Sequence, residues 1–161
     1  MRLYRSSVSA VLLGLYALAC TSATAGDPPS PSRGQLLYVP VYSEVPYGDR
    51  GRTLNLAATL SIRNTDPEHS IEVRRADYHD AQGRTVRRYL MEPVTLAPLA
   101  STRVVVTESD RTGGVSASFL VEWTATKPVS PPLVETVMVS TASSQGISLT
   151  GQSQVVREVG P

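Results

Sequence analysis

Sulfur and imidazole groups are scarce in this sequence. Among 161 residues there is one cysteine, Cys20, and there are two histidines, His69 and His79. Because a lone cysteine cannot form an internal disulfide, the folded part must be stabilised by its hydrophobic core alone. Zinc sites normally use several nitrogen or sulfur ligands. If residues 70–79 are one extended strand, the two histidines lie about 33 Å apart, too far to share a metal or a proton.

Motifs for phosphate binding and for serine catalysis are also missing. Gly113-Gly114 lacks the further glycines and the following helix of a phosphate loop. Residues 146–151, Gly-Ile-Ser-Leu-Thr-Gly, resemble a nucleophile elbow only superficially, because the second glycine comes one residue late and no helix is predicted after it. Ser148 is therefore interpreted as a turn or strand serine. We expect no catalytic residue, no cofactor and no enzymatic activity.

The first residues have the pattern of a secretory signal peptide. Residues 1–7 carry Arg2 and Arg5 without an acid, and residues 8–19 are apolar apart from a serine and a tyrosine. This run is too short to cross a bilayer, which takes about 20 apolar residues. Losing the two arginines changes the formal net charge from +1 to −1, so no global field favours nucleic acid as a partner.

Two cleavage sites fit the end of this leader, and both stay open. Ala23-Thr24-Ala25 is a small-x-small site, and its cleavage would make residues 1–25 the signal peptide. Alternatively, Cys20 follows Ala17-Leu18-Ala19 in an order that resembles a bacterial lipobox, although lipoboxes usually carry leucine in place of Ala17. The leader is then residues 1–19, Cys20 is lipidated, and Thr21 suggests sorting to the outer membrane. Either way we expect an exported protein, periplasmic or an outer-membrane lipoprotein.

A segment rich in proline and serine follows the leader. Residues 26–34, Gly-Asp-Pro-Pro-Ser-Pro-Ser-Arg-Gly, hold three prolines and no large apolar side chain. This composition is typical of an extended tether, which leaves residues 35–161 as one domain.

Alternation of apolar and polar residues is clearest in residues 52–64. Successive side chains of a strand point to opposite faces, so this spacing predicts a central strand with one face packed and one face in water. The apolar residues at every second position are Leu54, Leu56, Ala58, Leu60 and Ile62.

Shorter strands are predicted on both sides of this stretch. Pro40 lies inside residues 35–45, so that strand should be an edge strand or be broken in two. The alternation of residues 71–79 slips by one position, which predicts a bulge near Arg74-Arg75. A hairpin turn at residues 80–83 should follow, and then a charged strand at residues 84–90 that faces solvent or lies at an edge.

The second half of the domain also predicts strands. Residues 95–101 have the leucine, proline and small polar residues of a crossing between sheets, ahead of a strand at 102–107. Phe119, Val121 and Trp123 share one face of a strand at 116–124, with Trp123 as a core anchor. Three prolines within residues 127–132 should break the sheet. With further strands at 133–141, 147–150 and 154–159, and no helical periodicity, we predict a single immunoglobulin-like antiparallel β-sandwich, an all-β fold.

Three stretches resemble a known bacterial family. They are residues 37–43 (Leu-Tyr-Val-Pro-Val-Tyr-Ser), residues 61–66 (Ser-Ile-Arg-Asn-Thr-Asp) and residues 145–148 (Gln-Gly-Ile-Ser). Together they resemble the family catalogued as domain of unknown function 3124, and the likeness covers about residues 35–159. The resemblance implies exported or lipid-anchored bacterial proteins, and it supplies no activity and no catalytic residues.

Asp77-Tyr78-His79-Asp80 is the sharpest candidate for a ligand site. In a strand Asp77 and His79 point the same way, and Asp80 can approach from the turn, which would offer oxygen and nitrogen donors to a metal. The favoured alternative is a solvated hairpin end in which Asp80 caps its own turn. Nearby arginines, interleaved with acids, predict cross-strand ion pairs, and a docking patch for an anionic partner is the alternative. They are Arg74, Arg75, Arg84, Arg87 and Arg88.

From these observations we expect a non-catalytic protein-binding or scaffolding module of the bacterial cell envelope. Its contact surfaces would be open sheet edges near residues 36–42 or 84–90, and its partner would be another envelope protein, which the sequence does not identify. The alternative is a metal or small-ligand carrier that uses Asp77, His79 and Asp80. An enzyme with an unfamiliar site is the least favoured hypothesis.

Overall fold

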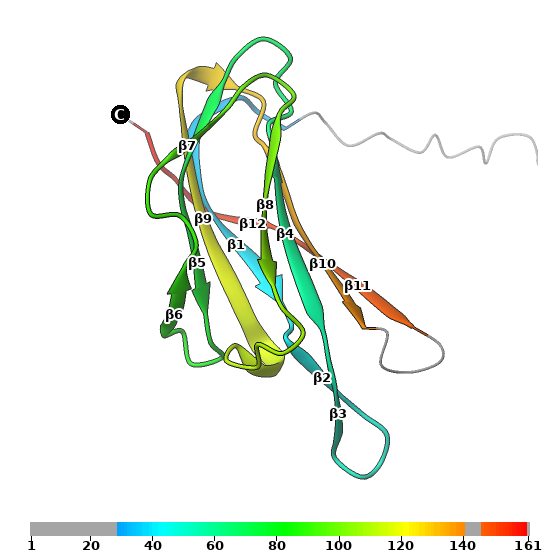
Figure 1. Ribbon diagram of the computed structural model, residues 1–161. Coiled ribbons are helices and arrows are strands. Elements are labelled where there is room, and N and C mark those ends of the chain that lie inside the picture. Colours follow the sequence, from blue (N-terminus) through cyan, green and yellow to red (C-terminus); the bar gives the residue numbers. More distant parts are fainter. Residues whose placement is uncertain (1–28, 141–145, 161) are drawn as a thin grey trace, which may run out of the picture.

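The computed structural model describes residues 29–140 and 146–160, which form two large antiparallel β-sheets packed face to face and one small two-stranded sheet (Figure 1). One sheet has the strand order β12-β1-β9-β5-β6, with β7 beside β5, and the other has the order β11-β10-β4-β8. This architecture confirms the predicted all-β antiparallel sandwich. The strands are β1 (Ser32–Val41), β2 (Glu44–Tyr47), β3 (Arg52–Asn55), β4 (Ala57–Arg63), β5 (Ile71–His79), β6 (Thr85–Arg88), β7 (Val94–Leu96), β8 (Ser101–Val106), β9 (Ala117–Val129), β10 (Leu133–Ser140), β11 (Ile147–Gln152) and β12 (Gln154–Glu158).

The predicted leader lies outside these described residues, and so do both cleavage sites and Cys20. In the part of the chain that the structure describes, the only helical turn is a short 3-10 helix at Gly114–Ser116. No helix there is long and apolar enough to cross a membrane.

Strand β1 begins at Ser32, so residues 32–34 belong to the fold and the predicted tether of 26–34 is too long at its C-terminal end. Gly34 lies where three chain segments meet. A Cβ atom there would be 2.2 Å from the carbonyl oxygen of Val159 and 2.7 Å from that of Trp123. The composition of this segment suggested a tether because it does not reveal that neighbouring backbones approach Gly34 this closely.

The prediction that Pro40 makes its strand an edge or breaks it was wrong, because β1 is continuous and interior. It pairs with β9 along its length and with β12 over residues 35–38. Pro40 lies beyond the end of that second ladder, and its carbonyl accepts a hydrogen bond from Thr136 Oγ1 of β10 at 2.6 Å. In an antiparallel strand the nitrogen and the carbonyl of one residue point to the same side. The Pro40 carbonyl points away from β9, so its nitrogen does too, and the N–H that proline lacks is not needed in the β1–β9 ladder. Of the open edge expected near residues 36–42, β12 therefore occupies residues 36–38.

The predicted central strand at residues 52–64 is two strands. β4 lies in the middle of its sheet between β10 and β8, whereas β3 pairs with β2 in a hairpin that projects from one end of the sandwich (Figure 1). The break falls at Leu56, whose N–H donates to the Ser43 carbonyl at 2.9 Å. The five alternating apolar residues are all buried, as predicted. The break does not disturb their phase, which is why alternation alone did not reveal it.

The hairpin between β5 and β6 confirms the predicted local features. The β5–β9 register shifts between Val73 and Arg75, which is the predicted bulge. Gly83 has a φ of 77° and its N–H donates to the Asp80 carbonyl at 2.9 Å, closing the turn. Strand β6 is shorter than predicted, lies at the sheet edge and is exposed at every residue.

The chain crosses between the sheets after β7, as predicted. β7 pairs with β5 in one sheet, and β8 pairs with β4 in the other. Leu99, in the crossing, has a φ of 59° and is exposed. The predicted break at residues 127–132 begins too early, because β9 continues to Val129 and pairs there with Ser32.

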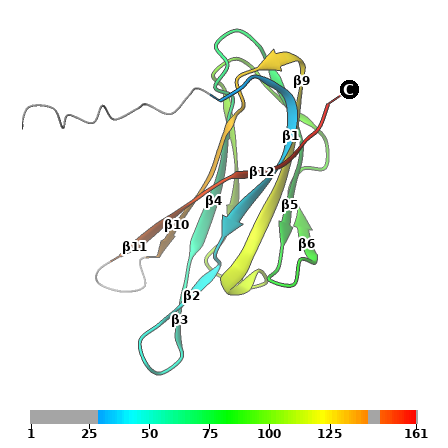
Figure 2. The same cartoon turned by 180° about the vertical axis from the view of Figure 1, so that it is seen from behind.

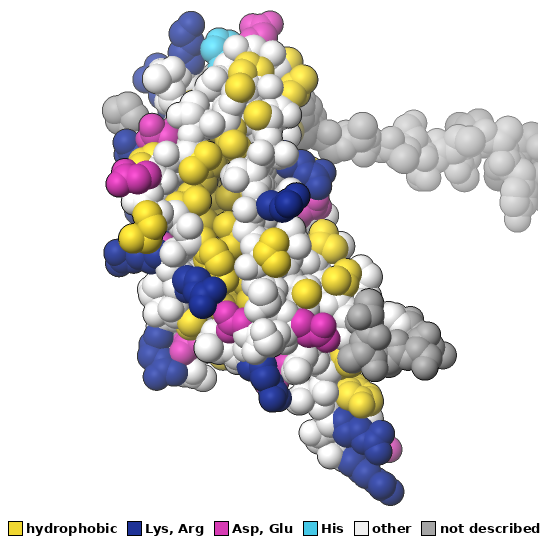
Figure 3. Space-filling view, viewed as in Figure 1, with side chains coloured by type: hydrophobic (Ala, Val, Ile, Leu, Met, Phe, Trp, Pro, Cys, Tyr) yellow, Lys and Arg dark blue, Asp and Glu magenta, His cyan; other side chains and the backbone are white. Residues whose placement is uncertain are grey.

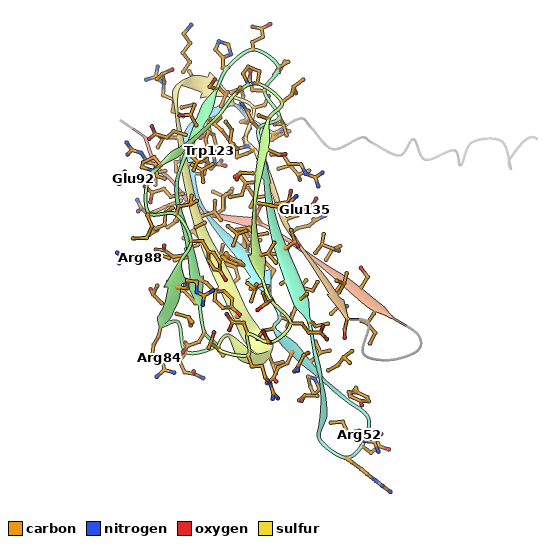
Figure 4. The ribbon with its side chains drawn as sticks, in the orientation of Figure 1. Arg52, Arg84, Arg88, Glu92, Trp123 and Glu135 are labelled. Carbon is orange, nitrogen blue, oxygen red and sulfur yellow. The ribbon has the colours of Figure 1, made fainter. Side chains whose placement is uncertain are left out.

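Aromatic side chains of β5 and β9 form the centre of the core. Trp123, Phe119 and Tyr78 have no exposed surface, and Figure 4 shows Trp123 between the two sheets. The Tyr78 and Phe119 rings are 5.1 Å apart between centroids. Trp123 is thus the core anchor that was predicted.

Two contacts connect the sheets on the side where the chain ends. β11 leads through Ser153 into β12, which joins the other sheet beside β1 (Figure 2). On the same side, the hydroxyl of buried Thr136 in β10 donates to Pro40 of β1. The opposite side of the sandwich, between β6 and β8, has no such connecting strand among the described residues.

Candidate functional site

Asp80 of the predicted ligand trio is engaged in its own hairpin turn. Its Oδ1 accepts the N–H groups of Gln82 at 2.9 Å and Arg84 at 3.0 Å, and its Oδ2 lies 2.7 Å from the Arg84 guanidinium. Burial acts to raise the pKa of Asp80, but the hydrogen bonds and the charge of Arg84 outweigh it and lower the pKa. Asp80 therefore caps the turn, as the favoured alternative predicted. The hairpin end is not solvated as that alternative also predicted, because Asp77, His79 and Asp80 are all buried.

Asp77 and His79 point to the outer face of their sheet but make separate contacts. The Asp77 carboxylate lies 3.7 Å from Arg75 Nε. His79 Nδ1 is 3.1 Å from the Asp77 carbonyl oxygen and Nε2 is 3.1 Å from Thr85 Oγ1, so both ring nitrogens have protein partners. Within residues 29–140 and 146–160, no three His, Cys, Asp or Glu side chains are grouped so that they could hold a metal ion. The geometry does not favour the carrier alternative.

Most of the predicted arginine patch is engaged in ion pairs. Two of these pairs are local, Arg74 with Glu72 at 2.8 Å and Arg84 with Asp80 at 2.7 Å. The cross-strand pairing that was predicted is found at Arg75, which lies 3.6 Å from Glu122 of β9. Figure 4 shows Arg84 and Arg88 pointing away from the sandwich on the β6 side. These pairs leave little free positive charge on this face.

An open groove of about 730 Å³ lies beside the start of β5 and the end of β9. Its lining includes Glu68, His69, Glu72, Arg74 and Lys127. Arg74 is paired with Glu72, and His69 Nδ1 is 3.3 Å from Asp66 Oδ1. The groove thus mixes both signs of charge, and Glu72, Arg74 and His69 already have partners within the protein.

The outer strands of the two large sheets differ in how well their edges are protected. They are β12, β6 and the short β7 in one sheet and β11 and β8 in the other. β6 carries arginines, and β12 carries Arg157 and Glu158, and charged side chains on an edge oppose pairing with another chain. The β11 edge, Ile147–Gln152, begins one residue after the undescribed segment 141–145. β8 is a further edge, and its last three residues are valines in succession, Val104 to Val106.

The hydrogen-bond pattern shows which backbone groups of β8 face outward. Asn64 N–H donates to the Ala100 carbonyl at 2.9 Å, at the end of the β4–β8 ladder. Because hydrogen-bonded and non-hydrogen-bonded pairs alternate in an antiparallel ladder, Thr102, Val104 and Val106 bond to β4. The N–H and C=O groups of the alternate residues then point away from β4. These residues are Ser101, Arg103 and Val105, and no described residue pairs with their backbone groups.

Hydrophobic side chains lie beside this open edge. Tyr89 and Leu90, which follow β6, and Val94, the first residue of β7, are partly buried against the core. Figure 3 shows hydrophobic side chains in a broken band between the positions of β5 and β8, with Lys or Arg side chains on both sides of it. Val105 is 47% exposed on the outer face of β8. An open backbone edge beside an apolar band is the geometry that accepts an added strand.

Sequence reasoning missed the β8 edge. It predicted the strand at 102–107 but gave it no place in the sheet, and the strand order is what makes β8 an edge. The one available signal was a valine-rich run with a single charge, which is typical of interior strands as well.

Comparisons with known proteins show a family but name no activity. A family model described as "Protein of unknown function (DUF3124)" matches residues 34–156. No curated protein matches the chain. The crystal structure of Thermotoga maritima 1070 is similar over 80% of this chain and 98% of its own, with 14% sequence identity and a TM-score of 0.46.

Proposed function

We propose a protein-binding role for this chain, which belongs to the family of proteins of unknown function DUF3124. The chain is a non-catalytic binding or scaffolding module of the cell envelope, and it takes an extended segment of an envelope protein as an additional strand on β8. The observation that supports this role is the open edge at Ser101, Arg103 and Val105, whose backbone groups lack partners among the described residues. Main-chain hydrogen bonds to such an edge provide affinity without any catalytic group.

Proline substitution offers a test that leaves the fold in place. Val105→Pro removes an N–H that points away from β4, so the β4–β8 ladder keeps its hydrogen bonds. Arg88→Pro is the matched control on the β6 edge. Tyr89 N–H donates to the Ala76 carbonyl, so Tyr89 is a hydrogen-bonded position of the β5–β6 ladder. Because such positions alternate, the N–H of the preceding residue, Arg88, points outward. Both variants should keep the circular dichroism spectrum of the wild type.

The binding experiment compares these variants in the native host. Tagged full-length chains are cross-linked in cells, and the recovered envelope proteins are quantified. We expect a partner that is recovered with the wild type and with Arg88→Pro but lost with Val105→Pro. The partner must then bind the purified chain directly and slow amide hydrogen exchange at Ser101, Arg103 and Val105. A set of recovered proteins that does not change with Val105→Pro would contradict the proposed role.

The cellular location is part of the proposal and has its own test. The basic start, the apolar run and the two cleavage sites support export, with the chain periplasmic or held on the outer membrane through Cys20. Mass spectrometry of the mature N-terminus should find either an acylated Cys20 or a free Gly26. A chain from the host that still begins at Met1 would exclude both forms of export.

A further inference from the structure

The charge on the outer face of β8 is a single unpaired arginine. Arg103 is exposed and lies between Ser101 and Val105, the two other residues whose backbone groups face outward. On the same face of the sheet, the neighbour of Arg103 on β4 is Ser61, and the neighbour of Ser61 on β10 is Glu135. Glu135, however, lies 3.2 Å from Arg63 and is paired with it. Among the described residues, Arg103 therefore has no acidic partner, and it stands directly beside the position that an added strand would occupy.

The inner face of β8 is apolar at the same place. Val104 and Val106 point into the core, and the partly buried side chains of Leu90 and Val94 lie on this open side of the sandwich. Arg87 covers one end of the apolar band, with its guanidinium 5.5 Å from the centre of the Tyr89 ring. Its acidic partner, Asp110, is 4.0 Å away. A strand beside β8 would thus meet hydrophobic side chains inward and a free positive charge outward.

We infer that the partner segment is an extended acidic strand, with Asp or Glu opposite Arg103 and apolar residues on either side of it. Side chains of a strand alternate between its faces, so the acid pairs with Arg103 while the flanking residues cover the apolar band. This inference rests on the proposed function and specifies the chemistry of its partner. A second copy of β8 fits less well, because symmetric pairing centred on Arg103 would place two arginines opposite each other.

Short labelled peptides test the charge preference on the full-length protein. Three peptides alternate valine with glutamate, with glutamine or with lysine, and fluorescence anisotropy measures their binding. The glutamate peptide should bind up to about fivefold more tightly than the glutamine peptide. Arg103→Glu should reverse the order, so that the lysine peptide binds best. The matched charge reversal on the other edge, Arg88→Glu, should leave the order unchanged.

The outcomes separate this inference from the proposed function. If binding is lost in Val105→Pro but is equal for the glutamate and glutamine peptides, the inference that the partner is acidic is overturned. The proposal that β8 accepts an added strand then still holds. An unchanged order in Arg103→Glu would have the same two consequences. Self-association of the wild type that Val105→Pro abolishes, measured by sedimentation, would identify a second copy as the occupant and overturn the inference. Binding of all peptides that Val105→Pro does not affect would contradict both proposals.

Discussion

Asp66 joins two loops at one end of the sandwich through a single carboxylate. It accepts the N–H groups of Glu68 at 2.9 Å, His69 at 2.8 Å and Ser130 at 3.2 Å. The hydrogen bond from Glu68 is the main cause that lowers the pKa of Asp66 from 3.8 to about 2. Burial opposes this shift, and the bonds from His69 and Ser130 add to it. The neighbouring Asn64 side chain donates to the carbonyls of residues 69, 96 and 97, so this polar stretch is a structural centre.

Asp66 should make the stability of the fold depend on pH in the acidic range. Its folded-state pKa is below the ordinary value, so its stabilisation is complete above about pH 4 and is lost as the pH falls to about 2. Asp66→Asn should lower the free energy of unfolding at neutral pH and flatten the fall in stability between these pH values. Urea unfolding at a series of pH values measures this. Glu68→Gln, at an exposed neighbour, should keep the wild-type slope, and a wild-type slope in Asp66→Asn would contradict the prediction.

At the scale of single strands, the sequence predicted features that leave a mark on alternation and missed those that do not. The bulge at Arg74 shifts the phase of β5, so the slip revealed it. The break at Leu56 keeps the phase, so residues 52–64 were predicted as one strand. The prediction for Pro40 failed for a different reason. An interior strand can hold a proline at this position because β12 ends before it, and the end of β12 cannot be read from the residues of β1. Periodicity reports on one strand at a time and does not show its neighbours.

A substitution at Gly34 tests whether β1 begins at Ser32, where the structure places it. A Cβ atom at Gly34 would meet backbone oxygens on both sides, which cannot move as a flexible side chain would. Gly34→Ala should therefore destabilise the fold by about 1–3 kcal/mol in chemical unfolding. Gly160→Ala is the control, because its Cβ would lie 3.4 Å from the nearest atom, the Arg33 Cβ, and should cost little. If residues 32–34 were tether, both variants would unfold at the same denaturant concentration as the wild type.

For the whole molecule, the fold class followed from the sequence and the candidate site did not. Many short alternating stretches can bury their apolar rows only against one another, which requires two sheets. Asp77, His79 and Asp80 do lie at the end of one hairpin, as their spacing suggested, but each has a protein partner within the sandwich. The β8 edge arises from strand order and hydrogen-bond phase, which are properties of the assembled sheets. The identities of the side chains do not reveal this edge, because its binding groups belong to the backbone.

The connection between the two sheets at Thr136 should determine how well they hold together. Its buried hydroxyl donates to the Pro40 carbonyl at 2.6 Å, and that carbonyl lies beyond the reach of β12. Thr136→Val keeps the shape but leaves the carbonyl without its donor, so we expect a loss of about 1–3 kcal/mol in the free energy of unfolding. Thr136→Ser keeps the hydroxyl and removes one methyl group, which should cost about 0.8 kcal/mol.

Thermal and urea unfolding of these two variants distinguish the hydrogen bond from packing. If the bond between the sheets matters, Thr136→Val unfolds before Thr136→Ser, and both show one cooperative transition, since the sheets share a single core. The reverse order would mean that the methyl group contributes more than the hydroxyl and that packing alone joins β1 to β10. Two separate transitions in Thr136→Val would mean that the sheets unfold independently once this bond is lost, and the single-core description would then fail.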